Sequence, residues 1–160
     1  MLNIVYNYNK ELVNQWIKEG KNTELSLFFR FFCFWIAFNH FITAKYQVSG
    51  DMELLRRFNK EYNNHFKKLV NSNEELREKI RKLRQQTPIY DTRPENRNVK
   101  IIIDDGTDIK QVFDTIYQIR CNLIHGSKIF DADRDNILVQ LAYEILFVII
   151  EEFLEVRQNE

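Results

Sequence analysis

Hydrophobic residues recur at the three- and four-residue spacing of an α-helix over most of this chain. The pattern is clearest over about 51–71, where the apolar positions are Leu54, Leu55, Phe58, Tyr62, Phe66 and Leu69. The same spacing predicts further helices at about 10–19, 23–48, 107–125 and 131–156. A capping-box pattern at 72–75, Ser-Asn-Glu-Glu, predicts one more helix that runs to about Gln86.

The residues at the ends of these segments fit helix boundaries. Thr23 precedes the longest apolar run and is expected to be the N-cap of its helix. The glycines fall where a periodic segment stops or is about to start, at Gly20, Gly50, Gly106 and Gly126. Glycine readily takes the left-handed conformation that ends helices, so these positions mark the connections.

One segment departs from the helical pattern, over about 87–106. Both prolines, Pro88 and Pro94, lie in its polar first half. Its second half contains a β-branched run at 99–103, which predicts either a short strand or an apolar plug under the loop. A connection of roughly twenty residues is longer than usual, and such loops often carry function. The predicted fold is an all-α bundle of five to six helices with this one long loop, in a single domain over 1–160.

Composition agrees with a helical globular protein. The chain has 160 residues, of which 44% are hydrophobic and 29% charged, so it is neither a disordered tail nor a disulfide scaffold. Four glycines and two prolines are too few for an all-β chain with many turns. Cys33 and Cys121 have no metal-ligand spacing, and two thiols fit a reducing cytosol.

The strongest candidate for a membrane span is the segment from Leu25 to Ile42. Arg30 interrupts it, and an arginine at the centre of a bilayer costs roughly 2.5 kcal/mol or more. The N-terminus has no basic region followed by an apolar run, so no signal peptide is expected. The sequence therefore predicts a cytoplasmic protein with no membrane partner.

Charge is unevenly distributed, although the net charge is zero. Residues 1–50 carry +2, residues 51–100 carry +5 and residues 101–160 carry −7. Three arginines of the basic middle, Arg77, Arg81 and Arg84, lie on one face of the predicted helix. Such a face can bind the phosphates of RNA, and it can equally be an ordinary solvated surface.

The helix expected at 107–125 ends in a group of residues that can carry chemistry. Arg120 and His125 lie about 140° apart around its axis, and Asn122 lies about 60° from His125. A guanidinium binds phosphate through a fork of N–H donors, and an imidazole can take or deliver a proton. The three residues therefore suit cleavage of RNA by its own 2′-hydroxyl, a reaction that needs no metal. A purely structural role for the arginine and histidine is the alternative.

No metal set or cofactor site is expected. The aspartates at 131–135 imitate the start of an EF-hand loop. The loop lacks the glycine of position six, where Asn136 stands, and the glutamate of position twelve, where Ala142 stands. These aspartates instead fit the acidic N-terminus of the last helix, where the helix dipole stabilises negative charge.

The chain resembles the HEPN superfamily, whose small helical domains carry an Arg-x4–6-His motif. The matching residues are Arg120 and His125, followed by Gly126, Ser127 and Lys128. The aromatic helix around 34–42 and the apolar last helix are also similar. The resemblance implies a metal-independent endoribonuclease, a toxin or phage-defence effector, that acts as a homodimer with a composite site. It further implies Arg120 as the phosphate ligand, His125 as the acid–base group, and an antitoxin or other defence protein as a partner.

The chain departs from the family at the position after the arginine, which is often a polar residue such as asparagine. Cys121 stands there, and Asn122, the expected third catalytic group, follows one place later. Some HEPN domains are non-catalytic. The alternative function is therefore a helical module of the same fold that binds a protein or RNA, and a small adaptor or immunity-type helical protein is a third.

Overall fold

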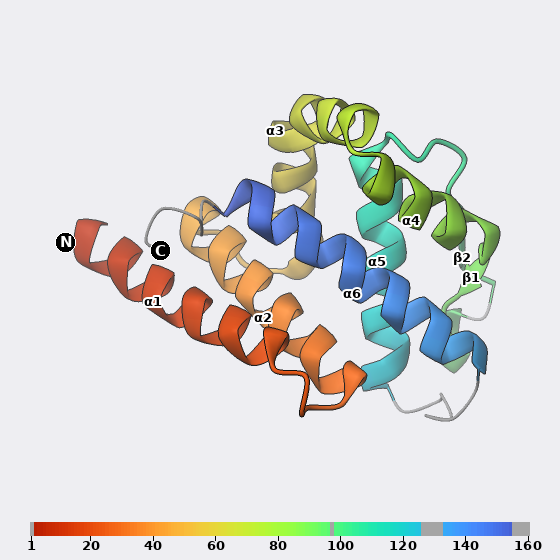
Figure 1. Cartoon of the computed structure of the whole chain (residues 1–160), viewed down its shortest axis with the longest axis horizontal. Coiled ribbons are helices and arrows are strands. Elements are labelled where there is room, and N and C mark those ends of the chain that lie inside the picture. Colours follow the sequence, from red (N-terminus) through yellow and green to blue (C-terminus); the bar gives the residue numbers. More distant parts are fainter. Residues whose placement is uncertain (1, 97, 126–132, 155–160) are drawn as a thin grey trace. The chain divides into compact units, whose positions relative to one another are not determined.

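The computed structural model describes residues 2–96, 98–125 and 133–154, with side chains from residue 10 onward (Figure 1). The described residues form six α-helices and one small sheet. The helices are α1 (Leu2–Lys21), α2 (Leu27–Tyr46), α3 (Asp51–Ser72), α4 (Glu74–Gln85), α5 (Ile109–Ile124) and α6 (Asp133–Phe153). The predicted all-α fold is confirmed.

Two helix starts differ from the prediction. Helix α1 begins at Leu2, well before the expected position near residue 10. Helix α2 begins at Leu27, and its N-cap is Ser26, whose Oγ accepts a hydrogen bond from Phe29 N at 3.3 Å. Thr23 is therefore not the cap. It lies in a turn before the helix, in which Leu25 N donates to Asn22 O at 3.2 Å.

The segment before α5 folds into a two-stranded antiparallel sheet. Strands β1 (Ile89–Tyr90) and β2 (Lys100–Ile101) pair so that Ile89 lies opposite Ile101 and Tyr90 opposite Lys100. A 3-10 turn, η1 (Pro94–Asn96), lies between them. The sequence left open a short strand or an apolar plug at 99–103, and the structure contains both. Lys100–Ile101 is a strand, and Ile103 is buried. Strand β1 is absent from the sequence prediction.

The packing divides the chain into two compact units. The first contains Met1–Phe58 and Tyr143–Glu160, and the second contains Asn59–Ala142. Helices α3 and α6 each contribute residues to both units. The single domain over 1–160 stays a prediction.

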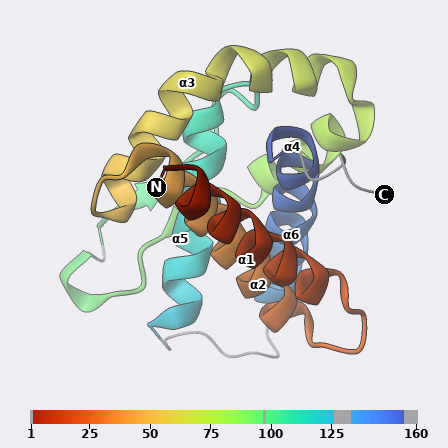
Figure 2. The ribbon, with the colours of Figure 1, turned by 90° about the vertical axis from the view of Figure 1, so that its left-hand side faces the viewer.

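In the first unit, α1 and α2 run side by side (Figures 1 and 2). The most apolar face of α2 is fully buried, including Phe31, Phe34 and Phe38. The ring of Phe34 stacks on that of Tyr143 with centroids 4.8 Å apart. The ring of Phe38 meets that of Phe58 edge-on at 4.9 Å. Aromatic packing of this kind dominates the core of the unit.

Arg30 is the one charge within the apolar part of α2, and hydrogen bonds satisfy it. Its Nη2 donates to the Tyr143 hydroxyl at 2.5 Å, and its Nε donates to Gly20 O at 3.1 Å. The Tyr143 hydroxyl also donates to Gly20 O, at 3.0 Å. Three segments, the end of α1, the start of α2 and α6, are joined at this point. A partly buried charge is tolerated because its donors find acceptors.

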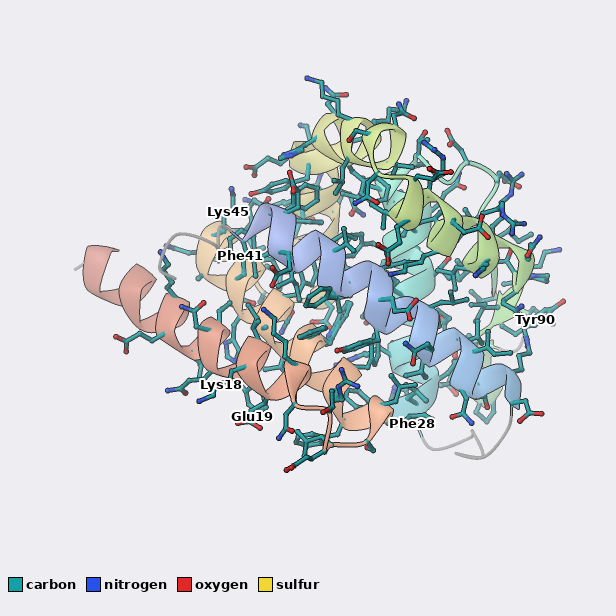
Figure 3. All side chains as sticks on the ribbon, in the orientation of Figure 1. Lys18, Glu19, Phe28, Phe41, Lys45 and Tyr90 are labelled. Carbon is teal, nitrogen blue, oxygen red and sulfur yellow. The ribbon has the colours of Figure 1, made fainter. Side chains whose placement is uncertain are left out.

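Among the described residues, α2 is one helix that is long and apolar enough to cross a membrane. Its buried aromatic side chains and the bonded Arg30 are typical of a core helix. Near its C-terminus, the ammonium of Lys45 lies 5.9 Å from the centre of the Phe41 ring (Figure 3). The absence of a membrane partner and the cytoplasmic location stay predictions.

In the second unit, the hairpin of β1 and β2 packs against α5. Helix α4 buries Leu76, Ile80 and Leu83, and a Cβ at Gly106 would come within 2.9 Å of the Ile80 side chain. The first turn of α6 is tied to the chain after α4, because Arg134 Nη2 donates to Gln86 O at 2.8 Å. Figure 2 shows α5 and the chain segment that precedes it.

Candidate functional site

Helix α5 carries the predicted catalytic residues, and its sequence fixes both of its ends. Asp108 is the N-cap, with its carboxylate accepting a hydrogen bond from Lys110 N at 2.9 Å. Apolar residues at helical spacing are buried along the helix: Ile109, Val112, Phe113, Ile116 and Ile119. His125 is the C-cap, and its N–H donates to Cys121 O at 3.0 Å. The motif therefore occupies the last two turns of a firmly held helix.

Arg120 is partly buried beside two residues of its own helix. Its Nη1 lies 3.8 Å from the Cys121 sulfur, and its guanidinium carbon lies 5.7 Å from the centre of the Tyr117 ring. Sulfur is a weak acceptor and a ring face a weak partner for a cation. A phosphate oxygen is a stronger acceptor for this guanidinium than either.

His125 is exposed at the end of α5. It is in the position from which an imidazole can reach a substrate bound at the end of the helix. The three residues that follow it in the motif, Gly126, Ser127 and Lys128, lie outside the described residues.

Asn122 is buried and faces the hairpin segment. Its Oδ1 accepts hydrogen bonds from Thr92 N and Thr92 Oγ1, both at 3.2 Å, and from Gln118 Nε2 at 2.9 Å. Its Nδ2 donates to Tyr90 O at 2.9 Å. The amide therefore anchors the segment after β1 to α5. This gives Asn122 a structural role, and its catalytic role stays a prediction.

The segment that Asn122 anchors contains an ion pair which the sequence analysis did not single out. Asp91 is buried, and both of its oxygens accept hydrogen bonds from Arg93 at 2.5–3.1 Å. Its Oδ2 also accepts from Asn96 Nδ2 at 3.0 Å. The hydrogen bonds from the Arg93 side chain hold the pKa of Asp91 well below its usual range, and those from Arg93 N and Asn96 add to the effect.

The arginines predicted to bind RNA lie on another helix, α4, and two of them have partners within the protein. Arg77 Nη1 donates to Asn71 O at 3.0 Å, so it satisfies a carbonyl at the end of α3. Arg81 forms a two-fold hydrogen bond with Glu78, at 2.7 Å each. Arg84 is exposed, and together with Lys67 it lies close enough to Asp105 to lower the pKa of that carboxyl, although hydrogen bonds from Thr107 lower it more. Their role in RNA binding stays a prediction.

The acidic cluster before α6 belongs to the helix start, as predicted for the part that is described. Asp133 and Asp135 lie in the first turn of α6, and Asp135 is buried. Asp131 lies outside the described residues. Within the described ranges, no three histidine, cysteine, aspartate or glutamate side chains are grouped so that they could hold a metal ion. A small open depression beside Asp135 is lined by Ile119, Asn122, Leu123, Leu138 and Val139.

Arg120, His125 and the contact of Asn122 with the loop all lie at the C-terminal end of α5. Arg120 is partly buried and His125 is exposed, whereas Asn122 holds the loop and the α4 arginines belong to a separate helix. Arg93 is the functional candidate that sequence reasoning missed. The signal for it was the length of the connection, which predicted a functional loop without indicating a residue.

Comparison with known proteins found no family model, no curated protein and no solved structure that matches this chain.

Proposed function

We propose that this protein is a metal-independent RNA endonuclease of HEPN type that acts as a homodimer. The observation that carries the proposal is the placement of Arg120 and His125 in the last two turns of α5, the arginine partly buried and the histidine exposed. A partly buried guanidinium favours charge-assisted bonds to a phosphate, and an exposed imidazole at the helix end can reach the reacting oxygens.

The proposed reaction begins with the 2′-hydroxyl of a ribose. Its oxygen attacks the adjacent phosphorus while His125 accepts the proton. The bond from phosphorus to the 5′-oxygen of the next nucleotide then breaks, and that oxygen receives a proton from a second imidazole. The products are a 2′,3′-cyclic phosphate and a 5′-hydroxyl end. Arg120 stabilises the negative charge that accumulates on the phosphate oxygens.

A homodimer supplies the second imidazole as a second copy of His125. Ile124, directly before His125, is 49% exposed, and Ile137 on α6 is 46% exposed. The exposed apolar side chain of Ile124, directly beside the proposed site in the chain, fits a contact with a second copy. An Ile124→Asp variant is expected to remain folded by circular dichroism, to lose the dimer in analytical ultracentrifugation and to lose cleavage with it.

The decisive experiment is cleavage of labelled RNA in excess EDTA. Wild-type protein is expected to yield 2′,3′-cyclic phosphate ends, and His125→Ala is expected to lower the rate by about 10²–10⁴-fold. His65→Ala is the matched control, because His65 is also an exposed histidine, on α3. Arg120→Lys keeps the charge but loses the fork of donors, so an intermediate rate is expected.

The alternative is a non-catalytic module of the same fold that binds a protein or RNA. It replaces the proposal if the wild-type dimer cleaves no single-stranded or structured RNA, or if His125→Ala cleaves as fast as wild type. An antitoxin or another defence-system protein remains the proposed partner in either case, and co-purification from the native host tests that partner.

A further inference from the structure

Arg93 lies in the segment that the anchoring amide of Asn122 holds against α5. Thr92, the residue before it, donates both its N–H and its hydroxyl to Asn122. Asn122 is two residues after Arg120 and three before His125. Arg93 therefore directly follows a residue that is hydrogen-bonded to the end of α5 that carries Arg120 and His125.

The helix geometry puts this contact on the side of His125. With about 100° per residue, His125 lies about 40° from Cys121 and about 60° from Asn122, between the two. The segment is bonded to Asn122, and hydrogen bonds to Asp91 raise the pKa of Arg93, with a smaller electrostatic contribution from nearby Cys121. The Cys121 sulfur is also the atom beside Arg120 Nη1. The guanidinium groups of Arg93 and Arg120 are therefore both near Cys121. His125 lies between Cys121 and Asn122 around the helix axis.

Among the described residues, acceptors occupy one edge of the Arg93 guanidinium. Nε and Nη2 donate to the Asp91 carboxylate, which is 2% exposed. For Nη1, on the other edge, the described part of the chain provides no hydrogen-bond acceptor, and 34% of the side chain is exposed. A guanidinium whose orientation is fixed by a buried carboxylate presents its second edge without a further loss of side-chain entropy.

We propose that Arg93 is a second phosphate-contacting residue of the Arg120–His125 site, oriented by Asp91. This inference rests on the proposed function. Because the negative charge of Asp91 offsets the positive charge of Arg93, Arg93 contributes to phosphate binding chiefly through its oriented N–H donors. The phosphate is that of the nucleotide next to the cleaved bond or of the cleaved bond itself, and both belong to the RNA backbone.

The test avoids leaving a buried carboxylate without its partner. In the double variant Asp91→Asn/Arg93→Ala the pair is removed at constant net charge. It is expected to lose about 10–100-fold in kcat/KM for RNA, the value of one or two hydrogen bonds to a charged group. Arg93→Lys is expected to lose less, because it keeps a donor and the charge. Circular dichroism and thermal melting show whether each variant is folded.

The matched control is Glu53→Gln/Arg56→Ala on α3, which removes another two-fold carboxylate–guanidinium pair at constant net charge. It is expected to cleave as fast as wild type. A folded Asp91→Asn/Arg93→Ala variant that also cleaves as fast as wild type overturns the inference.

Binding of a 2′-O-methyl RNA, which lacks the attacking hydroxyl, separates this inference from the proposed function. Fluorescence anisotropy is expected to show weaker binding by the double variant than by wild type and the control. If wild type binds this RNA through Arg93 but cleaves no RNA, the inference stands and the nuclease proposal fails. If wild type does not bind it, or the double variant binds it equally well, the inference fails.

Discussion

At the scale of single residues, the amide of Asn122 uses its donor and its acceptor at the same time. It accepts from Thr92 and Gln118 and donates to Tyr90 O, all in a buried position. A buried amide stabilises a fold only when its hydrogen bonds are formed. A donor or acceptor that is buried without a partner has lost its bonds to water and gained none in return.

Replacing Asn122 with alanine is therefore expected to destabilise the protein. Thr92 N and Tyr90 O would lose their partner, at a cost of about 1–3 kcal/mol in the free energy of unfolding. Urea unfolding measures it. Asn64→Ala, at an exposed position of α3, is the control and is expected to change stability by less than about 0.5 kcal/mol. Equal effects of the two substitutions would mean that the Asn122 bonds contribute nothing.

Gly20 is a residue of α1 that lies directly against the Phe34 ring of α2. A Cβ there would lie 2.3 Å from two ring atoms of Phe34. Alanine raises helix propensity by about 1 kcal/mol, but overpacking a core costs about 1–3 kcal/mol, and Phe34 is fully buried. We expect Gly20→Ala to lower the melting temperature.

A Phe34→Leu background checks the cause. The smaller side chain leaves room, so Gly20→Ala is expected to cost less there than in wild type. An equal cost in both backgrounds would show that the Phe34 ring is not responsible.

At the scale of elements, the three arginines that the sequence groups on α4 have different surroundings. Arg77 satisfies carbonyls at the end of α3 and Arg81 is paired with Glu78, whereas Arg84 is exposed near Asp105.

We expect Arg84→Ala to weaken RNA binding and to reduce its salt dependence more than Arg81→Ala, because Glu78 already offsets Arg81. Arg77→Ala is expected to act mainly on stability. Anisotropy titrations at several salt concentrations test this order, and identical slopes for wild type and Arg84→Ala would remove α4 from the RNA-binding surface.

The hairpin segment makes stability depend on pH through Asp91. Hydrogen bonds from Arg93 lower the pKa of Asp91 in the folded state, so the folded protein binds fewer protons than the unfolded chain in acid. The stabilisation is complete above the ordinary aspartate pKa of about 4 and is lost as the pH falls below it. Urea unfolding at pH 2–7 should therefore show the difference in stability between wild type and Asp91→Asn beginning to narrow below about pH 4. Asp104→Asn, at an exposed position of the same segment, is the control.

The helices were predictable because each carries its own periodic apolar face. In α3 the spacing suffices, and for α4 the predicted capping box is wrong by one residue, because Ser72 ends α3 and Asn73 is the N-cap of α4. Strand β1 was not predictable, because two residues are too short for a pattern and its pairing partners are ten and twelve residues farther along the chain. The start of α2 was also misplaced, since Thr23 and Ser26 are equally good caps by sequence and only the turn at 22–25 decides between them.

The candidate site divides in the same way. Arg120 and His125 could be proposed from their spacing on one helix. The position of Asn122 could not, because a 3.6-residue period gives its direction but not its partners, which are about 30 residues away. Arg93 depends on that same long-range contact, so no local pattern indicates it.

At the scale of the whole molecule, two compact units share two helices. Residues 51–58 of α3 belong to the first unit and residues 59–72 to the second, and α6 is divided at Ala142 and Tyr143. Melting either unit would remove part of a helix whose remainder is buried in the other.

We therefore expect a single unfolding transition. Gly20→Ala, in the first unit, and Asn122→Ala, in the second, should each shift the same transition, followed by circular dichroism and by tryptophan fluorescence. The two probes are expected to give coincident curves. Two separated transitions, each moved by one variant alone, would show instead that the units unfold independently.

The bond between Thr92 and Asn122 also has a consequence for the order in which the protein forms. Thr92 is synthesised 30 residues before Asn122, whose side-chain amide hydrogen-bonds to it in the folded protein. Until α5 has emerged, the nascent 87–106 segment has apolar residues such as Ile89 and Ile103 but lacks α5, the helix against which its hairpin packs. A chaperone that binds short apolar segments would find them during that interval, and the interval ends with the synthesis of α5.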